Sequence, residues 1–142
     1  MKYKTYLITA LFSIFFACDE NMDELIIANE TLIAGTWELT EAHISAGGPQ
    51  YWIDIENGEE IEFFENGTFT SNRYLECTQG SFSIDENNLS LKYECDDFSS
   101  DSENEDGFIT YNLKFYSHYF ILTRTSGAIC IEGCSSKYQS IK

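Results

Sequence analysis

Five cysteines, at positions 18, 77, 95, 130 and 134, carry the most reactive side chains of this 142-residue chain. The last four follow the spacing C-x17-C…C-x3-C, which lacks the two short paired loops of a zinc ribbon. In an exported chain, an even number of cysteines indicates disulfides. We therefore expect no metal site and two disulfides. Of the three connectivities we favour Cys77–Cys95 with Cys130–Cys134.

The remaining polar residues give little support for catalysis. Glu41 and His43 alternate on a predicted strand and would suit a metal pair or a general base, but a surface or packing histidine is far more common. His118 falls in a predicted turn, and no Gly-x-Ser-x-Gly motif precedes a helix. Four glutamates beside a predicted hairpin are interpreted as its solvent-facing side: Glu59, Glu60, Glu62 and Glu65. We expect no enzyme, no catalytic residue and no cofactor.

The acidic stretch DDFSSDSENEDG, residues 96–107, offers carboxylates at alternate positions, which suit calcium. Measured against an EF-hand loop that begins at Asp101, Asp106 stands where glycine is needed and Asn112 where glutamate is needed. We interpret the stretch as a solvated or disordered loop between strands.

The N-terminus MKYKTYLITALFSIFFAC has the parts of an export signal: Lys2 and Lys4, an apolar stretch, and the small residue Ala17 before Cys18. Its apolar run is shorter than the roughly 20 residues of a membrane-spanning helix. It resembles a bacterial lipoprotein signal of the Bacteroidetes type, in which the cysteine becomes the first residue and carries lipid. The acidic DENMDE that follows resembles a tether for surface display. The resemblance implies a lipid on Cys18.

The charge of the mature chain restricts its partners. All 24 acidic residues but only six of the eight basic ones follow residue 17, which gives a net charge of −18. Nucleic acid binding depends on lysine and arginine meeting phosphates, so we expect no nucleic acid partner. Such a charge favours solubility or a cationic partner.

Strand signals dominate after a short helix that we expect within residues 22–35. IEFFENGTFTSNRYL has Asn66-Gly67 between aromatic runs, which is typical of a two-residue hairpin turn. GSFSIDENNLSLKYEC and FITYNLKFYSHYFILTR predict two more hairpins, the latter with a turn near Ser117-His118. GTWELTEAHI opens the series, and AICIEGC is a candidate last strand. Seven to nine strands in an up-and-down antiparallel meander are expected.

The register of the second hairpin tests the favoured disulfide. Folding about Glu86-Asn87 sets Ile84 opposite Leu89 and Phe82 opposite Leu91. Cys77 is then one residue out of register with Cys95, so the bond requires a one-residue bulge near Gln79-Gly80.

The motif GTW at residues 35–37, with IEFFENGTF, C-x-x-G-S-F-S-I, L-S-L-K-Y and YFILTR, resembles the lipocalin-like lipoproteins of Bacteroidetes over residues 35–125. The resemblance implies an all-β barrel of about eight strands with a short N-terminal helix. It implies that Trp37 closes one end of the barrel and that Arg124 packs on it through a cation–π contact.

These features predict a signal at residues 1–17, a lipidated Cys18 with tether and short helix at 18–34, and a barrel at 35–142. We expect an outer-membrane lipoprotein, on the periplasmic face or the cell surface. It holds a small apolar ligand in an aromatic cup or, alternatively, has a filled barrel whose acidic surface meets a protein partner. The predicted cup residues are Phe63, Phe69, Phe82, Tyr93, Tyr111 and Phe115.

Overall fold

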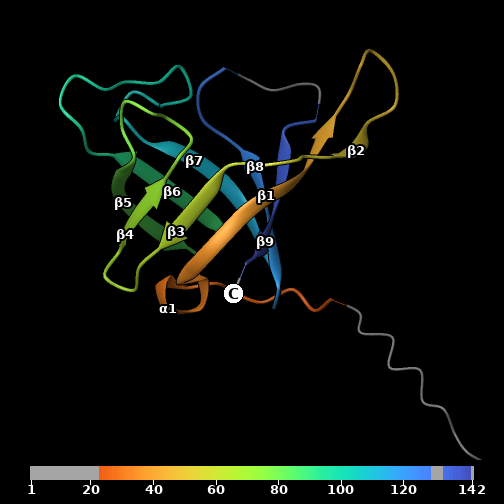
Figure 1. Cartoon of the computed structure of the whole chain (residues 1–142), viewed down its shortest axis with the longest axis horizontal. Coiled ribbons are helices and arrows are strands. Elements are labelled where there is room, and N and C mark those ends of the chain that lie inside the picture. The colour runs from red at the N-terminus through yellow and green to blue at the C-terminus, as the bar shows by residue number, and fades with distance from the viewer. Residues whose placement is uncertain (1–22, 129–132, 142) are drawn as a thin grey trace, which may run out of the picture.

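One antiparallel sheet of nine strands closes on itself, because β1 pairs with β9 (Figure 1). The computed structural model describes residues 23–128 and 133–141, so that Cys18, Cys130 and the predicted signal lie outside the described residues. The elements, in chain order, are α1 (Glu30–Ile33), β1 (Gly35–Ile44), β2 (Tyr51–Asp54), β3 (Glu60–Phe63), β4 (Thr68–Ser71), β5 (Gln79–Asp85), β6 (Asn88–Tyr93), β7 (Ile109–Phe115), β8 (Tyr119–Arg124) and β9 (Ser135–Ser140).

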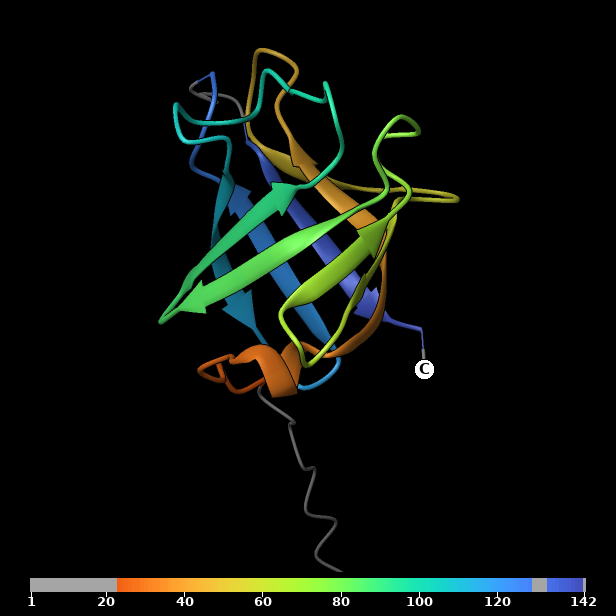
Figure 2. The ribbon, with the colours of Figure 1, turned by 90° about the vertical axis from the view of Figure 1, so that its left-hand side faces the viewer.

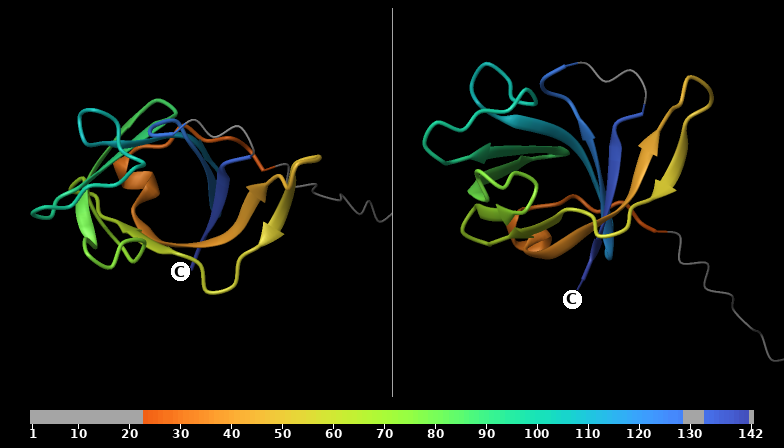
Figure 3. Two further views of the ribbon diagram at one scale, coloured as in Figure 1. Left: turned by 90° about the horizontal axis from the view of Figure 1, so that it is seen from above. Right: turned by 45° about the horizontal axis from the view of Figure 1, so that its top comes forward.

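The nine strands form an eight-stranded barrel, because β2 and β3 both pair with the same edge of β1, opposite the edge that pairs with β9. They act as one strand interrupted at residues 55–59, where the chain stays bonded to β1 through Ile55 N–H to the Thr40 carbonyl and Leu39 N–H to the Glu59 carbonyl. Gly58 is required at this break, since a Cβ there would lie 1.9 Å from the Leu39 carbonyl oxygen. The view from above shows the strands arranged as a ring (Figure 3). The predicted eight-stranded all-β barrel is confirmed.

The hairpin registers follow the alternating pattern of the sequence. Ile84 pairs with Leu89 and Phe82 with Leu91, as predicted. The first turn differs: Gly67 alone has positive φ, and its N–H bonds the Phe64 carbonyl. It is therefore a three-residue loop that ends in a glycine bulge, rather than a two-residue turn. The last strand among the described residues, β9, begins at Ser135, and most of the candidate strand AICIEGC lies outside the described residues.

One end of the barrel is closed by Trp37 and α1, which lies beneath the strands in Figure 2. The indole Nε1–H donates to the Ile33 carbonyl at 2.8 Å, and Ile33 is fully buried. The Trp37 ring packs on Phe115 and Phe120, with centroids 5.8 and 4.9 Å away. We call this end the floor and the opposite end the mouth. The predicted helix is shorter than expected, a single turn over Glu30–Ile33.

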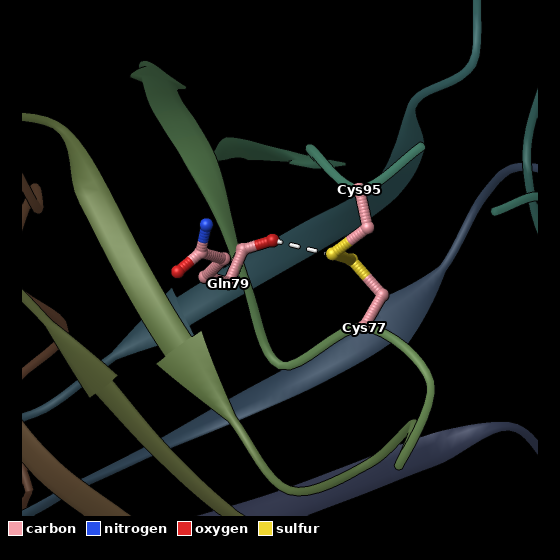
Figure 4. The surroundings of a disulfide bond; sticks show 3 residues. All are labelled: Cys77, Gln79 and Cys95. Atoms are coloured by element: carbon pink, nitrogen blue, oxygen red, sulfur yellow. Dashed lines mark hydrogen bonds between the residues drawn. A yellow bond between two sulfur atoms is a disulfide. The ribbon is translucent and has the colours of Figure 1, made fainter. Parts of the chain in front are cut away.

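A disulfide joins Cys77 to Cys95, with Cα atoms 5.7 Å apart (Figure 4). The pairing is the one that the sequence favours, but the expected bulge is absent, since β5 and β6 stay in register from Gly80 onward. Cys77 instead lies in a turn before β5, where its N–H bonds the Tyr74 carbonyl, and this turn brings it to Cys95. The second predicted bond, Cys130–Cys134, involves Cys130, which is not described.

The segment before α1 lies against the floor. Asp23 accepts a hydrogen bond from the Tyr119 hydroxyl at 3.0 Å, and Ile26 forms a β-bridge with Phe115. Within residues 23–128 and 133–141, no helix has the length and apolar character needed to cross a membrane.

Candidate functional site

The half of the barrel next to the floor is packed solid with aromatic rings. Phe63 lies at its centre, with its ring 4.8 Å from that of Phe82 and 6.3 Å from that of Phe120. All six predicted cup residues belong to the buried core and are at most 8 % exposed: Phe63, Phe69, Phe82, Tyr93, Tyr111 and Phe115. They give the barrel the aromatic interior that the sequence predicts, and their role as a ligand cup stays a prediction. Of the six, Tyr111 also lines the space that remains at the other end of the barrel.

That space is a cavity of about 240 Å³ at the mouth, which we call the mouth cavity. It is formed where β1 and β8 end, where β7 and β9 begin, and by Arg73 just after β4. Its lining is Ala42, His43, Ile44, Arg73, Tyr111, Leu122, Arg124, Gly133, Cys134, Ser135, Ser136 and Tyr138. The lining combines apolar side chains with hydrogen-bonding and cationic ones.

A polar network centred on Glu59 lies between the aromatic core and the mouth cavity. Its carboxylate accepts from Ser71 Oγ at 2.9 Å and from the Tyr138 hydroxyl at 3.1 Å. Arg73 Nη1 lies 3.5 Å from the same carboxylate and 3.4 Å from the Tyr111 hydroxyl. The Glu59 side chain is only 12 % exposed, so this charge sits inside the barrel and is held by three partners.

Three buried tyrosines around this network stay protonated at neutral pH. Burial raises the pKa of Tyr111 to about 12. Burial, and then the charge of Glu59, raises the pKa of Tyr138 well above its ordinary value. Burial also raises the pKa of Tyr93, whose hydroxyl is buried beside Ser71. The network therefore presents neutral phenols, which donate as well as accept.

Arg124 lies at the mouth, not on the floor. It pairs across the sheet with Tyr111, whereas Phe120, four residues earlier on β8, is the residue that packs on Trp37. Four strand residues span roughly 13 Å, so the predicted contact of Arg124 with Trp37 is not formed. Its guanidinium instead donates to Ser102 Oγ at 2.7 Å and to the Ala128 carbonyl at 3.4 Å.

Ser102 belongs to the acidic stretch 96–107, a loop in which seven of twelve residues are exposed, as expected, but which buries Ser102 against the end of β8. Ser102 is 8 % exposed, and its carbonyl accepts from the buried Ser126 hydroxyl at 2.6 Å. The residues described contain no group of three or more histidine, cysteine or acidic side chains suited to a metal ion. The stretch thus positions Arg124.

The alternation of inward and outward side chains along a strand could have identified the two site residues that the sequence interpretation missed, Glu59 and Arg73. Glu59 has the parity of Ile61 and Phe63, which face inward, and Arg73 has the parity of Phe69 and Ser71. The charged neighbours Glu60 and Glu62 favour a solvent-facing side for Glu59, and that prediction is wrong. Alternation across the whole strand places Glu59 inside.

The histidines take structural positions. His43 shares its strand with Glu41, but Glu41 forms an ion pair with Lys137 at 2.7 Å. The ring of His43 packs on Trp52, 4.9 Å away. His118 lies in the turn between β7 and β8, where its carbonyl accepts from the Ser140 N–H.

The family profile of the lipocalin-like domain matches residues 33–117, from the end of α1 through β7. The chain belongs to this lipocalin-like family. Among solved structures, the lipocalin-like domain matches the crystal structure of a lipocalin-like protein from Bacteroides uniformis. The two are 15 % identical, and the match covers 77 % of this chain and 98 % of the other with a TM-score of 0.47. No curated protein matches.

Proposed function

We propose that this lipocalin-like domain is a binding module for a small molecule and that the mouth cavity is its binding site. The observation that carries the proposal is the contrast between the two halves of the barrel. The floor half is filled by aromatic rings, whereas the mouth half keeps an open volume ringed by buried polar groups. Concave sites with a few fixed polar groups are where small ligands bind.

The polar groups of the mouth are not what a barrel needs for folding alone. Enclosing a carboxylate such as Glu59 costs free energy unless every oxygen is bonded. Apolar side chains in this layer would extend the core without that cost. Lipocalin-like domains are generally binding proteins rather than enzymes, which agrees with a recognition role for this layer.

The dimensions of the mouth cavity restrict the ligand. About 240 Å³ is below the roughly 300–1,000 Å³ of typical ligand pockets. The ligand is therefore small, or it places only one end inside. Leu122, Ile44 and Ala42 offer an apolar wall, and the tyrosines and arginines offer the polar one.

Native mass spectrometry of the lipid-free mature chain tests the proposal. Residues 18–142 carrying Cys18→Ser contain every described residue and are purified without detergent from an oxidising periplasm. We expect a retained mass that organic solvent releases. Ala42→Phe, which fills the cavity, should abolish it. Ala46→Phe, the same change at an exposed loop position, should not. A clean apo mass together with no response to apolar probes would refute the binding role and favour the protein-partner alternative.

We also propose that Cys18 is acylated and that the protein is an outer-membrane lipoprotein. The support is the N-terminal sequence, with its basic start, short apolar stretch and Ala17-Cys18 junction. Two or more acyl chains hold a protein stably to a bilayer. Labelled palmitate should enter the full chain and not the Cys18→Ser variant, which should also leave the membrane fraction. Equal membrane association of both chains would contradict the anchor.

A further inference from the structure

We propose that the mouth cavity binds the carboxylate of a small monoanionic molecule, recognised by Arg124 and Arg73. The inference rests on the proposed function and names the chemical class of the ligand.

The cationic character of the mouth cavity stands out against the charge of the chain. The chain has 24 acidic and eight basic residues and only two arginines, and both arginines line this one cavity. Among the described residues, no aspartate or glutamate lines it. The lining of this cavity is therefore cationic in a chain whose net charge is strongly negative.

Arg124 has no acidic partner among residues 23–128 and 133–141, where the ion pairs are Arg73–Glu59 and Lys137–Glu41. Its two hydrogen bonds go to neutral oxygens, those of Ser102 and Ala128. These bonds fix the direction of the guanidinium without neutralising it. An arginine held in this way is prepared for a carboxylate, which it can bind through two parallel hydrogen bonds.

Arg73 is only partly used by its protein partners. A guanidinium has five N–H donors, and the contacts of Arg73 with Glu59 and Tyr111 both involve Nη1. Both contacts are long, at 3.5 and 3.4 Å. The donors on Nε and Nη2 remain for a ligand, and the side chain is 33 % exposed, which leaves them accessible from the mouth.

A phenol next to Arg73 adds a donor. The Tyr111 hydroxyl accepts from Arg73 and lines the cavity, so its own proton is left to donate. An ionised carboxylate only accepts hydrogen bonds, which makes it the complement of such a set of donors.

The balance of charge favours a monoanion over a dianion. In the cavity lining and the carboxylate bonded to it, two arginines and Glu59 leave one positive charge. A single carboxylate would neutralise it. A phosphate dianion would leave excess negative charge in a chain that is already strongly negative. The apolar wall formed by Ile44 and Leu122 accommodates the rest of a small organic acid.

Isothermal titration of the lipid-free mature chain with benzoate and hexanoate, each compared with its uncharged amide, tests the inference. We expect each acid to bind more tightly than its amide. Arg124→Gln should weaken the acids about tenfold or more while leaving the amides within about twofold, because hydrogen bonds to charged groups are worth at least about tenfold in Kd. The matched control is Lys114→Gln, which removes the same charge from an exposed position on β7 and should change neither.

The amide separates failure of this inference from failure of the proposed function. If acid and amide bind equally and Arg124→Gln affects neither, the cavity binds ligands without recognising their charge, and the inference is overturned. If Arg124→Gln weakens both equally, the arginine only shapes the cavity, and the inference is overturned in the same way. Tighter binding of inorganic phosphate than of either acid also overturns it. Absence of binding by every probe counts against both proposals.

Discussion

Removing the disulfide between Cys77 and Cys95 should lower the stability of the barrel by an amount that follows from the length of chain it encloses. The two cysteines are 18 residues apart. The chain-entropy relation for a loop of this size gives about 3 kcal/mol at 25 °C. Cys77 is also 1 % exposed, so its replacement by alanine adds a packing loss of about 1 kcal/mol. The total for Cys77→Ala with Cys95→Ala is about 4 kcal/mol.

Urea unfolding of the double variant and of the parent chain measures this loss. At about 4 °C per kcal/mol for a domain of this size, the same change should lower Tm by roughly 16 °C. The m value should rise, because an unfolded chain without the cross-link exposes more surface to urea. That rise separates loss of the cross-link from loss of packing. A stability change below about 1 kcal/mol, or an unchanged m value, would refute the reasoning.

Three further predictions concern the sheet and the polar network. Gly80→Ala should destabilise the barrel by about 3 kcal/mol or more in urea unfolding, because the added Cβ would lie 2.0 Å from the Lys92 carbonyl oxygen on β6. The control Gly48→Ala adds its Cβ in open space and should leave the stability unchanged. Burial raises the pKa of Tyr111 from 10.0 to about 12, so Tyr111 contributes about 3 kcal/mol of stability that is complete below about pH 10 and is lost towards pH 12. Unfolding across that range should show a fall in stability, and Tyr111→Phe should make the fall smaller by about this amount, the remainder coming from the other buried tyrosines. Glu59→Gln should strengthen benzoate binding about tenfold, because the charge of Arg73 is then no longer neutralised by a carboxylate. An unchanged or lower benzoate affinity in isothermal titration would contradict this.

The sequence predicts the barrel well because its information is local and repeated. Alternation in the stretches around Phe82 and Leu91 sets both the face and the register of their strands, and polar turn residues set where each hairpin folds. The resemblance of GTW to the opening motif of the family predicts the floor, where Trp37 packs on Phe120.

The site is harder to predict because its polar side chains face inward at the ends of strands whose other inward-facing side chains are apolar. The turn near Ser117-His118 already implies that Arg124 faces Tyr111, which places Arg124 far from Trp37. The resemblance to a family motif directs it to the floor instead. Other features have no local signal. The contact of Ser102 with Arg124 depends on how a polar loop folds back, and no periodicity describes that.

The position of the first described residues sets the direction in which an anchored barrel would face. Asp23 is bonded to Tyr119 at the floor, and Cys18 precedes it by five positions, over which a chain reaches at most about 17 Å. The ten residues of β1 extend roughly 33 Å towards the mouth. If Cys18 is acylated, as we propose, the floor would face the bilayer and the mouth would open away from it. A ligand would then be exchanged with the aqueous phase, and a membrane lipid would have to leave the bilayer completely before it could enter.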